Sequence, residues 1–360
     1  FGRRGYYNSQ EIGLGRALAR KGHEVMIYKG IDPSEKEEKV QVEKNLTIWY
    51  LPMKHLGAHG FMDCKNLDPQ LKALFCFGDQ QIFLPHVYRW CRRRRIPFAA
   101  YVGTAHSLDS NFKSKVMNAL FAAGTLRIYK KNPVLAKTSA AKEELRQLGV
   151  PHAVIAPVGL DTAVLKKNIP ADEKMRLRKE HGFEADDVIL CNVSRLSWEK
   201  RPLELIDLFL QVKGKKKFKL IIVGNGPLEE ELNEKIRKNG LEKEVKIYPN
   251  VPYEKMWEIY EMSDYYLNMN KGEIFGMAIM EAVYYKTSVA AIRALGPSVT
   301  LKDMKGHKLC ENDDEMAEWI TGPYPSEKDL QESSEKMAAT FTWDRCADAF
   351  LQASSEKSSR

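Results

Sequence analysis

Short apolar runs alternate with amphipathic segments along the chain, and this alternation predicts strands and helices in turn. Residues 10–20 place apolar side chains at helical spacing, and the segment stops at Lys21 and Gly22 before a β-branched and aromatic run at 23–28. The later runs of this half are apolar on both faces, which is typical of a parallel sheet covered by helices. These runs are residues 71–77, 98–104, 134–138 and 153–157.

The same pattern begins again after about residue 170 and predicts a second α/β unit of similar size. A charge-alternating stretch over 229–240 predicts a solvated helix of this unit. Residues 161–171 combine a charge pair, Asn and Pro without periodicity, so we place the linker there. The predicted strands are residues 188–194, 219–226, 245–251, 264–270 and 287–292.

These elements predict an α/β fold with two doubly wound, Rossmann-like domains. A length of 360 residues fits this division, since a domain usually has about 100–200 residues. Such a domain opens with a strand that leads into a glycine loop. Because Phe1 already lies in a loop of this kind, we expect the first strand of the N-terminal domain to be missing.

The composition indicates a soluble, cytoplasmic chain. No stretch approaches the roughly 18–20 uncharged apolar residues that cross a bilayer, and the first ten residues lack the apolar core of a signal peptide. The six cysteines lie far apart without a CxxC pair, so we expect reduced thiols and no structural zinc site.

The positive charge belongs to the N-terminal half. The chain has 56 Lys and Arg against 48 Asp and Glu, a net charge of +8. Residues 1–160 carry 25 basic and 13 acidic side chains, net +12, which leaves 31 basic and 35 acidic, net −4, for the rest. The run CRRRR at 91–95 has two open interpretations: it complements a helix dipole, or it attracts anionic lipid headgroups or a lipid-diphosphate acceptor. Nucleic acid is not expected, because no basic face is interleaved with aromatic residues.

The most informative segment is GEIFGMAIMEA, in which Glu273 precedes a predicted helix and Glu281 follows eight residues later. The first turn of this helix would present the backbone N–H groups of Phe275, Gly276 and Met277 to phosphate or sugar oxygens. The alternative for this spacing alone is a buried helix with two surface carboxylates.

A second segment places Arg195 just after a predicted strand and Lys200 just before a helix with Pro202 in its first turn. Ligands bind outside the carboxyl ends of such strands, where this pair suits a departing phosphate. A solvated loop is the alternative. Gly224 belongs to LIIVGNGP, which resembles a nucleotide loop without matching a dinucleotide fingerprint or a P-loop.

Together these segments resemble the retaining family-4 glycosyltransferases of the B-type fold. The resemblance covers nearly the whole chain and also rests on GYYNSQEIGLGRALARKGHEV, YVGTAHS, VIAPVGLD and VKIYPNVPYEKMWEIYEMSDYYLNM. It implies two Rossmann-like domains that face a cleft, with a C-terminal helix that crosses back to the first domain. The implied parts are an acceptor-binding domain at 1–165, a nucleotide-sugar-binding domain at 166–338 and the returning helix at 339–354.

The resemblance also implies roles for single residues. Arg195 and Lys200 would hold the diphosphate, Glu281 the ribose hydroxyls and Glu273 the hydroxyls of the transferred sugar. His106 matches a histidine near the reacting centre. With Arg195, Lys200 and Glu273 it makes up the predicted catalytic set.

Further residues are implied to bind the donor. The main chain near Asn250 and Val251 would meet the base, and Gly5 occupies the glycine loop that approaches donor and acceptor. The remaining predicted donor-binding residues are Phe275, Gly276, Met277, Gly224 and Glu281.

The implied reaction transfers a glycosyl unit, with retention, from a nucleoside diphosphate sugar, foremost a UDP-sugar, to a glycan or lipid-linked acceptor. A role in cell-surface or capsular polysaccharide synthesis, on the inner face of the membrane, would follow. No metal and no cofactor are expected, because no DxD-type motif stands in the expected place. Two alternatives stay open: an inactive glycosyltransferase-like partner subunit, and a nucleotide-sugar epimerase of the same fold.

One departure from the family concerns the helix after Glu281. This helix usually ends in Gly followed by Pro, whereas Lys286 and Ser288 occupy these positions here. A left-handed conformation at Lys286 would cost about 1 kcal/mol.

Overall fold

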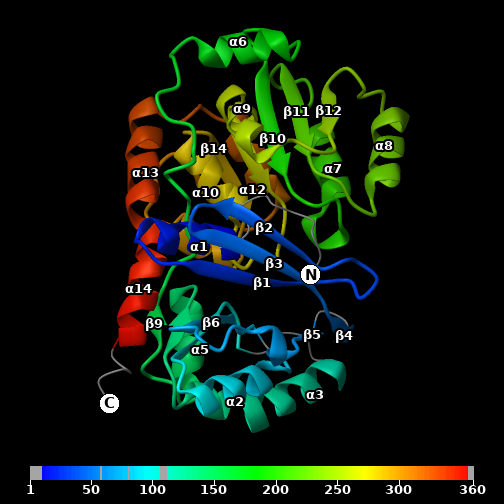
Figure 1. Ribbon diagram of the computed structural model, residues 1–360. Coiled ribbons are helices and arrows are strands. Elements are labelled where there is room, and N and C mark those ends of the chain that lie inside the picture. Colours follow the sequence, from blue (N-terminus) through cyan, green and yellow to red (C-terminus); the bar gives the residue numbers. More distant parts are fainter. Residues whose placement is uncertain (1–9, 57–58, 80, 106–111, 356–360) are drawn as a thin grey trace. The chain divides into compact units, whose positions relative to one another are not determined.

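The computed structural model describes residues 10–56, 59–79, 81–105 and 112–355 (Figure 1). The chain forms two compact units, one of Phe1–Asp161 with Thr342–Arg360, the other of Thr162–Phe341. The first part of the N-terminal unit thus ends at residue 161, four residues before the predicted boundary at 165. The chain returns to this unit at residue 342, three residues after the predicted position 339. None of the helices in the described ranges has the length and apolarity that a membrane span requires.

The C-terminal unit is built on a six-stranded sheet with the order β12-β11-β10-β13-β14-β15, in which every pairing is parallel. Strands β13 and β14 are buried along their whole length and β10 and β11 along most of theirs, because both faces are covered by helices. The strands are β10 (Val188–Val193), β11 (Phe218–Val223), β12 (Val245–Tyr248), β13 (Tyr265–Asn268), β14 (Ser288–Ile292) and β15 (Lys308–Cys310).

The strand order of this sheet reverses direction between β10 and β13. The chain moves outward from β10 to β12 and then returns to the other side of β10. Such a switch point opens a crevice at the carboxyl ends of the two strands, where ligands bind in open α/β sheets. The helices are α6 (Glu173–Glu180), α7 (Pro202–Val212), α8 (Glu229–Lys238), α9 (Met256–Met262), α10 (Met277–Tyr284), α11 (Leu295–Thr300), α12 (Asp313–Thr321) and α13 (Glu327–Thr340), with 3-10 turns η3 (Trp198–Lys200) and η4 (Tyr253–Lys255).

The strands of the N-terminal unit form three hydrogen-bonded groups rather than one continuous sheet. In the order β1-β3-β2, β1 is parallel and β2 antiparallel to β3, whereas β6-β7-β8-β9 is parallel throughout. The strands are β1 (Val25–Ile31), β2 (Glu38–Glu43), β3 (Leu46–Pro52), the pair β4 (Lys54–Leu56) and β5 (His59–Phe61), β6 (Leu74–Phe77), β7 (Phe98–Val102), β8 (Val134–Ala136) and β9 (Val154–Ile155).

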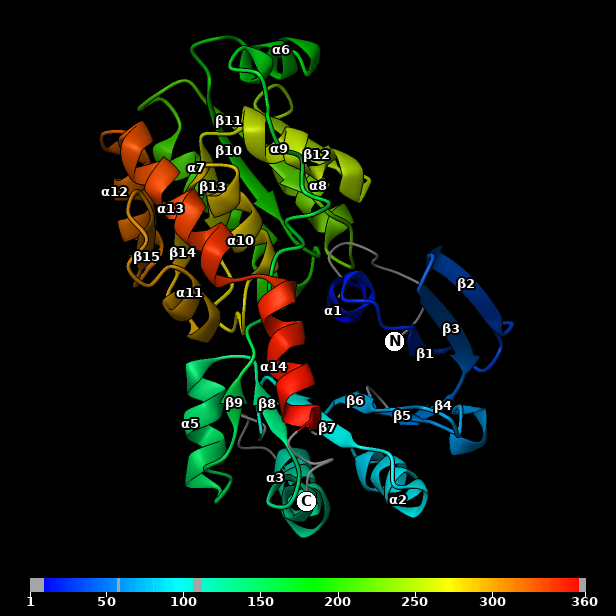
Figure 2. The ribbon, with the colours of Figure 1, turned by 60° about the vertical axis from the view of Figure 1, so that its left-hand side comes forward.

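Seven helical segments and a 3-10 turn complete the described part of the N-terminal unit. They are α1 (Gln10–Arg20), η1 (Cys64–Asn66), α2 (Leu84–Arg94), α3 (Phe112–Leu120), the π-helical turn η2 (Phe121–Thr125), α4 (Leu126–Tyr129), α5 (Ser139–Gln147) and α14 (Trp343–Ser355). The last of these is the returning C-terminal helix, which packs against α1 and β7 (Figure 2). A side chain on Gly13 of α1 would overlap Trp343, since its Cβ would lie 2.0 Å from the indole Nε1. The predicted fold class, with its returning helix, is confirmed.

Candidate active site

An ion pair joins the two loops that follow β10 and β13. Lys200, the last residue of η3, donates from Nζ to Glu273 Oε2 over 2.8 Å. The two side chains are only 21% and 15% exposed. The sequence predicted both residues separately, and the switch point of the sheet brings them together.

Glu273 is held as a carboxylate by its surroundings. Asn270 Nδ2 donates to its Oε2 at 3.1 Å. Burial alone would raise the pKa of Glu273, but the charge of Lys200 and hydrogen bonds from Lys200, Asn270 and Asn268 outweigh it, so the pKa is lowered. The site therefore presents a partly buried anion that is able to accept hydrogen bonds from hydroxyl groups.

Arg195 lies on the same loop as Lys200 but is much more exposed. Its side chain is 76% exposed and donates to Glu199 at 2.9 Å. Exposed pairs of this kind contribute little to stability, so the guanidinium is free to exchange Glu199 for another anion. The structure thus places Lys200, and not Arg195, in contact with Glu273.

The loop after β11 lies directly against the loop after β10. Gly224 has φ 143°, and a Cβ on it would lie 1.9 Å from the carbonyl oxygen of Ser194. Only glycine permits this approach, because any side chain would displace the loop that carries Arg195 and Lys200. The role of Gly224 seen here is to support that loop.

Helix α10 begins beside Glu273. Gly276 is its left-handed N-cap residue, with φ 82°, and Phe275 is buried. The N–H groups of the first turn have no partner within the helix and lie at the positive end of its dipole. The main-chain oxygen of Glu273 accepts from Gly296 N at 2.8 Å, which fixes the entry to the helix.

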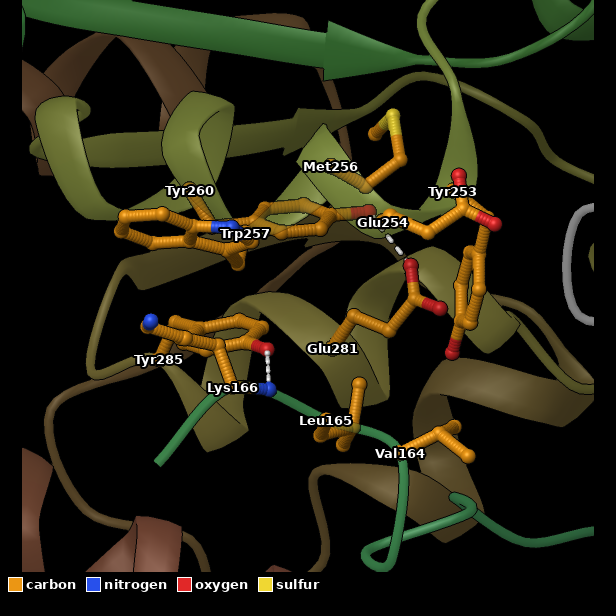
Figure 3. Close-up of a pocket in the computed structure, with 10 residues that line it drawn as sticks. All are labelled: Val164, Leu165, Lys166, Tyr253, Glu254, Met256, Trp257, Tyr260, Glu281 and Tyr285. Atoms are coloured by element: carbon orange, nitrogen blue, oxygen red, sulfur yellow. Dashed lines mark hydrogen bonds between the residues drawn. The ribbon is translucent and has the colours of Figure 1, made fainter. Parts of the chain in front are cut away.

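A pocket of about 110 Å³ lies along α9 and α10 (Figure 3). Glu281 lines it and is itself 5% exposed. The Tyr260 hydroxyl donates to Glu281 Oε2 at 2.7 Å, and Figure 3 shows this bond at the centre of the pocket. The other lining residues are Val164, Leu165, Lys166, Tyr253, Glu254, Met256, Trp257 and Tyr285.

Aromatic side chains form most of one wall of this pocket. Tyr260 stacks on Tyr285 with ring centroids 5.9 Å apart, and the Tyr285 hydroxyl accepts from Lys166 N at 3.1 Å. Burial, followed by the charge of Glu281, raises the pKa of Tyr260 well above its ordinary value. Tyr260 is therefore a permanent hydrogen-bond donor to Glu281 at physiological pH.

The remaining predicted residues are separated from this pocket or not described. Val251 is buried and Asn250 exposed in the loop after β12, and neither lines the pocket. Gly5 and His106 lie outside the described residues.

Three residues of the site, Asn270, Tyr260 and Tyr285, were not predicted. For Asn270, its position three residues before Glu273 was an available signal.

Comparison with known proteins identifies the part of the chain that carries this site. Residues 173–336 match the family described as Glycosyl transferases group 1. This segment is a group 1 glycosyltransferase domain. It contains the residues described above from Arg195 to Tyr285 and nearly all of the C-terminal unit.

Relatives of the group 1 domain resemble this chain over a larger part of its length. The D-inositol 3-phosphate glycosyltransferase of Xylanimonas cellulosilytica is 23% identical and covers 99% of this chain and 93% of its own. The uncharacterized glycosyltransferase MJ1607 of Methanocaldococcus jannaschii is 22% identical over 77% of this chain and 74% of its own.

Solved structures show the same fold in both units. Anabaena Alr3699/HepE in complex with UDP and glucose is 16% identical, with a TM-score of 0.72 over 99% of this chain and 97% of that one. Sucrose-phosphate synthase from Thermosynechococcus elongatus is 15% identical, with the same TM-score of 0.72 over 96% and 92%. At this level of identity the likeness shows the B-type glycosyltransferase fold.

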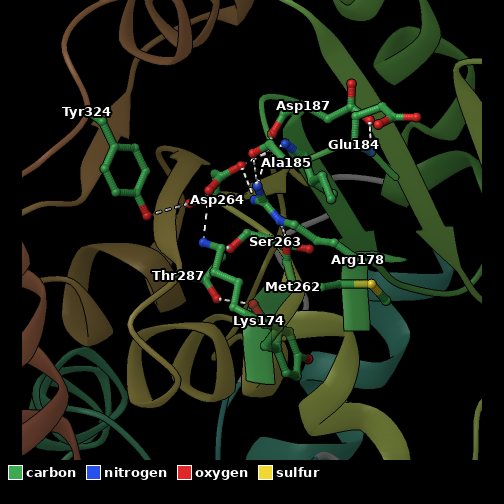
Figure 4. Close-up of polar contacts among 12 residues, drawn as sticks. Lys174, Arg178, Glu184, Ala185, Asp187, Met262, Ser263, Asp264, Thr287 and Tyr324 are labelled. Carbon is green, nitrogen blue, oxygen red and sulfur yellow. Dashed lines mark hydrogen bonds and ion pairs between the residues drawn. The ribbon is translucent and has the colours of Figure 1, made fainter. Parts of the chain in front are cut away.

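The group 1 domain also contains a polar network, shown in Figure 4. This network lies at the amino ends of β10 and β13, whereas the site described above lies at their carboxyl ends. Asp264 receives Arg178 Nη2 at 2.6 Å, Lys174 Nζ at 2.9 Å and the main-chain N–H of Ile189 at 2.8 Å. Arg178 also donates to the main-chain oxygens of Met262 and Asp187. Lys174 and Arg178 both lie on α6, so the network ties this helix to the sheet.

Within the described ranges, no group of three or more His, Cys, Asp and Glu side chains is arranged to hold a metal ion.

Proposed function

We propose that the protein is a retaining glycosyltransferase that moves a sugar from a UDP-sugar to a glycan or lipid-linked acceptor. The observation that carries this proposal is the Lys200–Glu273 ion pair at the switch point, beside the start of α10 and in the same domain as the Glu281 pocket. A cation, free N–H groups and two carboxylates thus lie in one domain, and a nucleoside diphosphate sugar needs each of them.

Each part of the donor, from its ribose to its sugar, would contact a different one of these groups. The pocket offers Glu281 to the ribose hydroxyls, and the start of α10 with Lys200 and Arg195 offers positive charge to the diphosphate. Glu273 would accept hydrogen bonds from hydroxyl groups of the sugar. UDP is the preferred nucleotide because the structural relative HepE binds UDP and glucose.

In the proposed reaction the bond between the anomeric carbon and the diphosphate oxygen breaks while the acceptor oxygen bonds to that carbon on the same face. The acceptor hydroxyl passes its proton to the departing diphosphate, so atoms and charge balance without an enzymic base. Lys200 and the N–H groups of α10 would stabilise the charge that develops on the leaving oxygen. Since these groups are supplied by the protein, we propose that the reaction needs no metal.

The acceptor class and the cellular role are proposals of the same kind. Two relatives are an alpha-monoglucosyldiacylglycerol synthase of Acholeplasma laidlawii and the amylovoran biosynthesis glycosyltransferase of Erwinia amylovora. These names support a lipid-linked or polysaccharide acceptor in cell-surface synthesis. The six free cysteines support a cytosolic location.

The proposal is tested by incubating the protein with a panel of nucleoside diphosphate sugars and acceptors in the presence of EDTA. We expect UDP release from a UDP-sugar, with the α or β configuration of the donor preserved in the product by NMR. Glu281→Gln should reduce the rate at least tenfold, whereas Glu234→Gln, an exposed carboxylate on α8, should not. Inversion, or activity restored only by Mg²⁺, would contradict the retaining or the metal-independent mechanism.

A further inference from the structure

The excess positive charge of the whole protein is confined to one segment. Residues 84–131 contain ten Lys and Arg and one acidic residue, Asp109, which gives a net charge of +9. The rest of the chain contains 46 basic and 47 acidic residues, net −1. This segment forms α2, β7, α3, η2 and α4 of the N-terminal unit.

Helix α2 presents this charge on its outer face. Its inner face is buried through Leu84, Val87, Trp90 and Cys91. The exposed positions include Arg89, Arg92 and Arg93, and none of these three forms an ion pair with any described residue. The outer face of α2 is therefore an uncompensated cationic stripe.

Helix α3 adds exposed apolar side chains. Val116 is 42% and Leu120 50% exposed, and Ala119 and Ala123 are exposed on the same side at helical spacing. Exposed Lys115 precedes these residues, and exposed Arg127, Lys130 and Lys131 follow them. The exposed surface of α3 and η2 thus combines an aliphatic stripe with cations at both of its ends.

The two helices lie at the same end of the N-terminal unit. Figures 1 and 2 both place α2 and α3 there, and η2 packs on the start of α2. A Cβ on Gly124 would lie 3.4 Å from Pro85 Cγ. We call the exposed residues of α2, α3, η2 and α4 the basic helical face.

We propose that the basic helical face docks the protein onto a bilayer that contains anionic lipids. Its arginines and lysines contact phosphate headgroups, while Val116 and Leu120 enter the boundary between headgroups and acyl chains. Aliphatic insertion distinguishes a bilayer from a soluble polyanion.

Nucleic acid fits this face less well than a bilayer. Single strands are held by bases that stack on exposed aromatic rings. On this segment Trp90, Phe98, Tyr101, Phe121 and Tyr129 are all buried. The face thus offers charge and aliphatic groups but few rings for stacking.

The test is co-sedimentation of the full chain with vesicles of phosphatidylcholine, with or without one-third phosphatidylglycerol. Arg92→Gln with Arg93→Gln should weaken binding to the anionic vesicles about tenfold or more, and Leu120→Gln about fivefold. The matched control, Lys215→Gln with Lys328→Gln, removes the same charge from exposed positions of the C-terminal unit and should leave binding unchanged. UDP binding, measured in parallel, should be the same in all these variants, which separates this proposal from the function proposed above.

Four results would overturn the proposal. Equal binding to neutral vesicles would remove the role of charge, and an equal loss in the control would remove the role of this face. Binding that inorganic phosphate abolishes, or single-stranded DNA binding that resists Leu120→Gln, would assign the face to a soluble anion or to nucleic acid instead.

Discussion

At the scale of single residues, the hydrogen bond from Tyr260 to Glu281 fixes how the pocket presents its buried carboxylate. It occupies Oε2 of a carboxylate that is buried along with its donor. Because the pKa of Tyr260 is raised, this donor does not titrate in the physiological range. Tyr260 thus acts as a positioning residue that fixes the orientation of Glu281.

Replacing Tyr260 by Phe should weaken UDP binding about three- to tenfold, since a buried carboxylate would lose one partner. The discrimination between UDP and its 2′- or 3′-deoxyribose analogue should fall in parallel, when measured by calorimetry. Tyr285→Phe removes a hydroxyl from the same wall without touching Glu281, and it should keep this discrimination. An unchanged preference in Tyr260→Phe would show that Glu281 needs no such support.

His307 is a second residue with a defined consequence. Its Nδ1 accepts from Val289 N at 3.0 Å, its Nε2 is buried, and burial lowers its pKa to about 4. Between the ordinary pKa of 6.5 and about 4, the unfolded chain binds a proton that the folded protein does not. The free energy of unfolding should therefore fall as the pH drops through this window, by up to about 3 kcal/mol.

His307→Gln retains an acceptor for Val289 and removes the titration. Denaturant unfolding at several pH values should show a shallower loss of stability below pH 6.5 in this variant. Equal slopes for the two proteins would contradict the effect of burial on His307.

At the scale of elements, the C-terminus of α10 has the strain that its sequence indicates. Lys286 is left-handed, with φ 60°, and Thr287 N then closes the turn on the oxygen of Ala282. Lys286→Gly should raise the free energy of unfolding by about 1 kcal/mol. Lys238→Gly, at the right-handed end of α8, should lower it by a similar amount. A loss of stability in Lys286→Gly, measured by thermal unfolding, would show that the lysine stem compensates for the strain.

The elements also show what the sequence could predict. Helix α1 has the predicted bounds Gln10–Arg20. Strands β10, β12, β13 and β14 lie within the predicted runs, and β11 begins one residue before its run, because long periodic or fully apolar segments carry a strong signal. Strands β2 and β3 were not predicted, since polar residues alternate through β2 and it pairs antiparallel at an edge. Strand β3 lies between β1 and β2 and pairs with both, and the local pattern does not show this pairing.

In the site, too, the sequence predicted single residues but not the tertiary contacts between them. Lys200 and Glu273 were each predicted, but their contact depends on β10 and β13 being neighbours, which only the sheet order reveals. Tyr260 and Tyr285 look like ordinary core residues in the sequence, and their role arises from packing around Glu281. Chemistry-bearing residues were thus easier to predict than the groups that orient them.

At the scale of the whole molecule, charge and ligand groups are separated between the two units. The C-terminal unit holds the Lys200–Glu273 pair and the Glu281 pocket, whereas the surplus positive charge lies on residues 84–131 of the N-terminal unit. This division fits a protein in which one unit binds a nucleotide sugar and the other meets an anionic surface.

The central claim is that the C-terminal unit binds a nucleoside diphosphate through these groups. Its most direct test is a calorimetric titration of UDP, in EDTA, into the wild-type chain and the variants Lys200→Met and Glu281→Gln. The account predicts saturable one-to-one binding to the wild type and at least tenfold weaker binding to each variant. No binding to the wild type, or equal affinity in all three proteins, would contradict it.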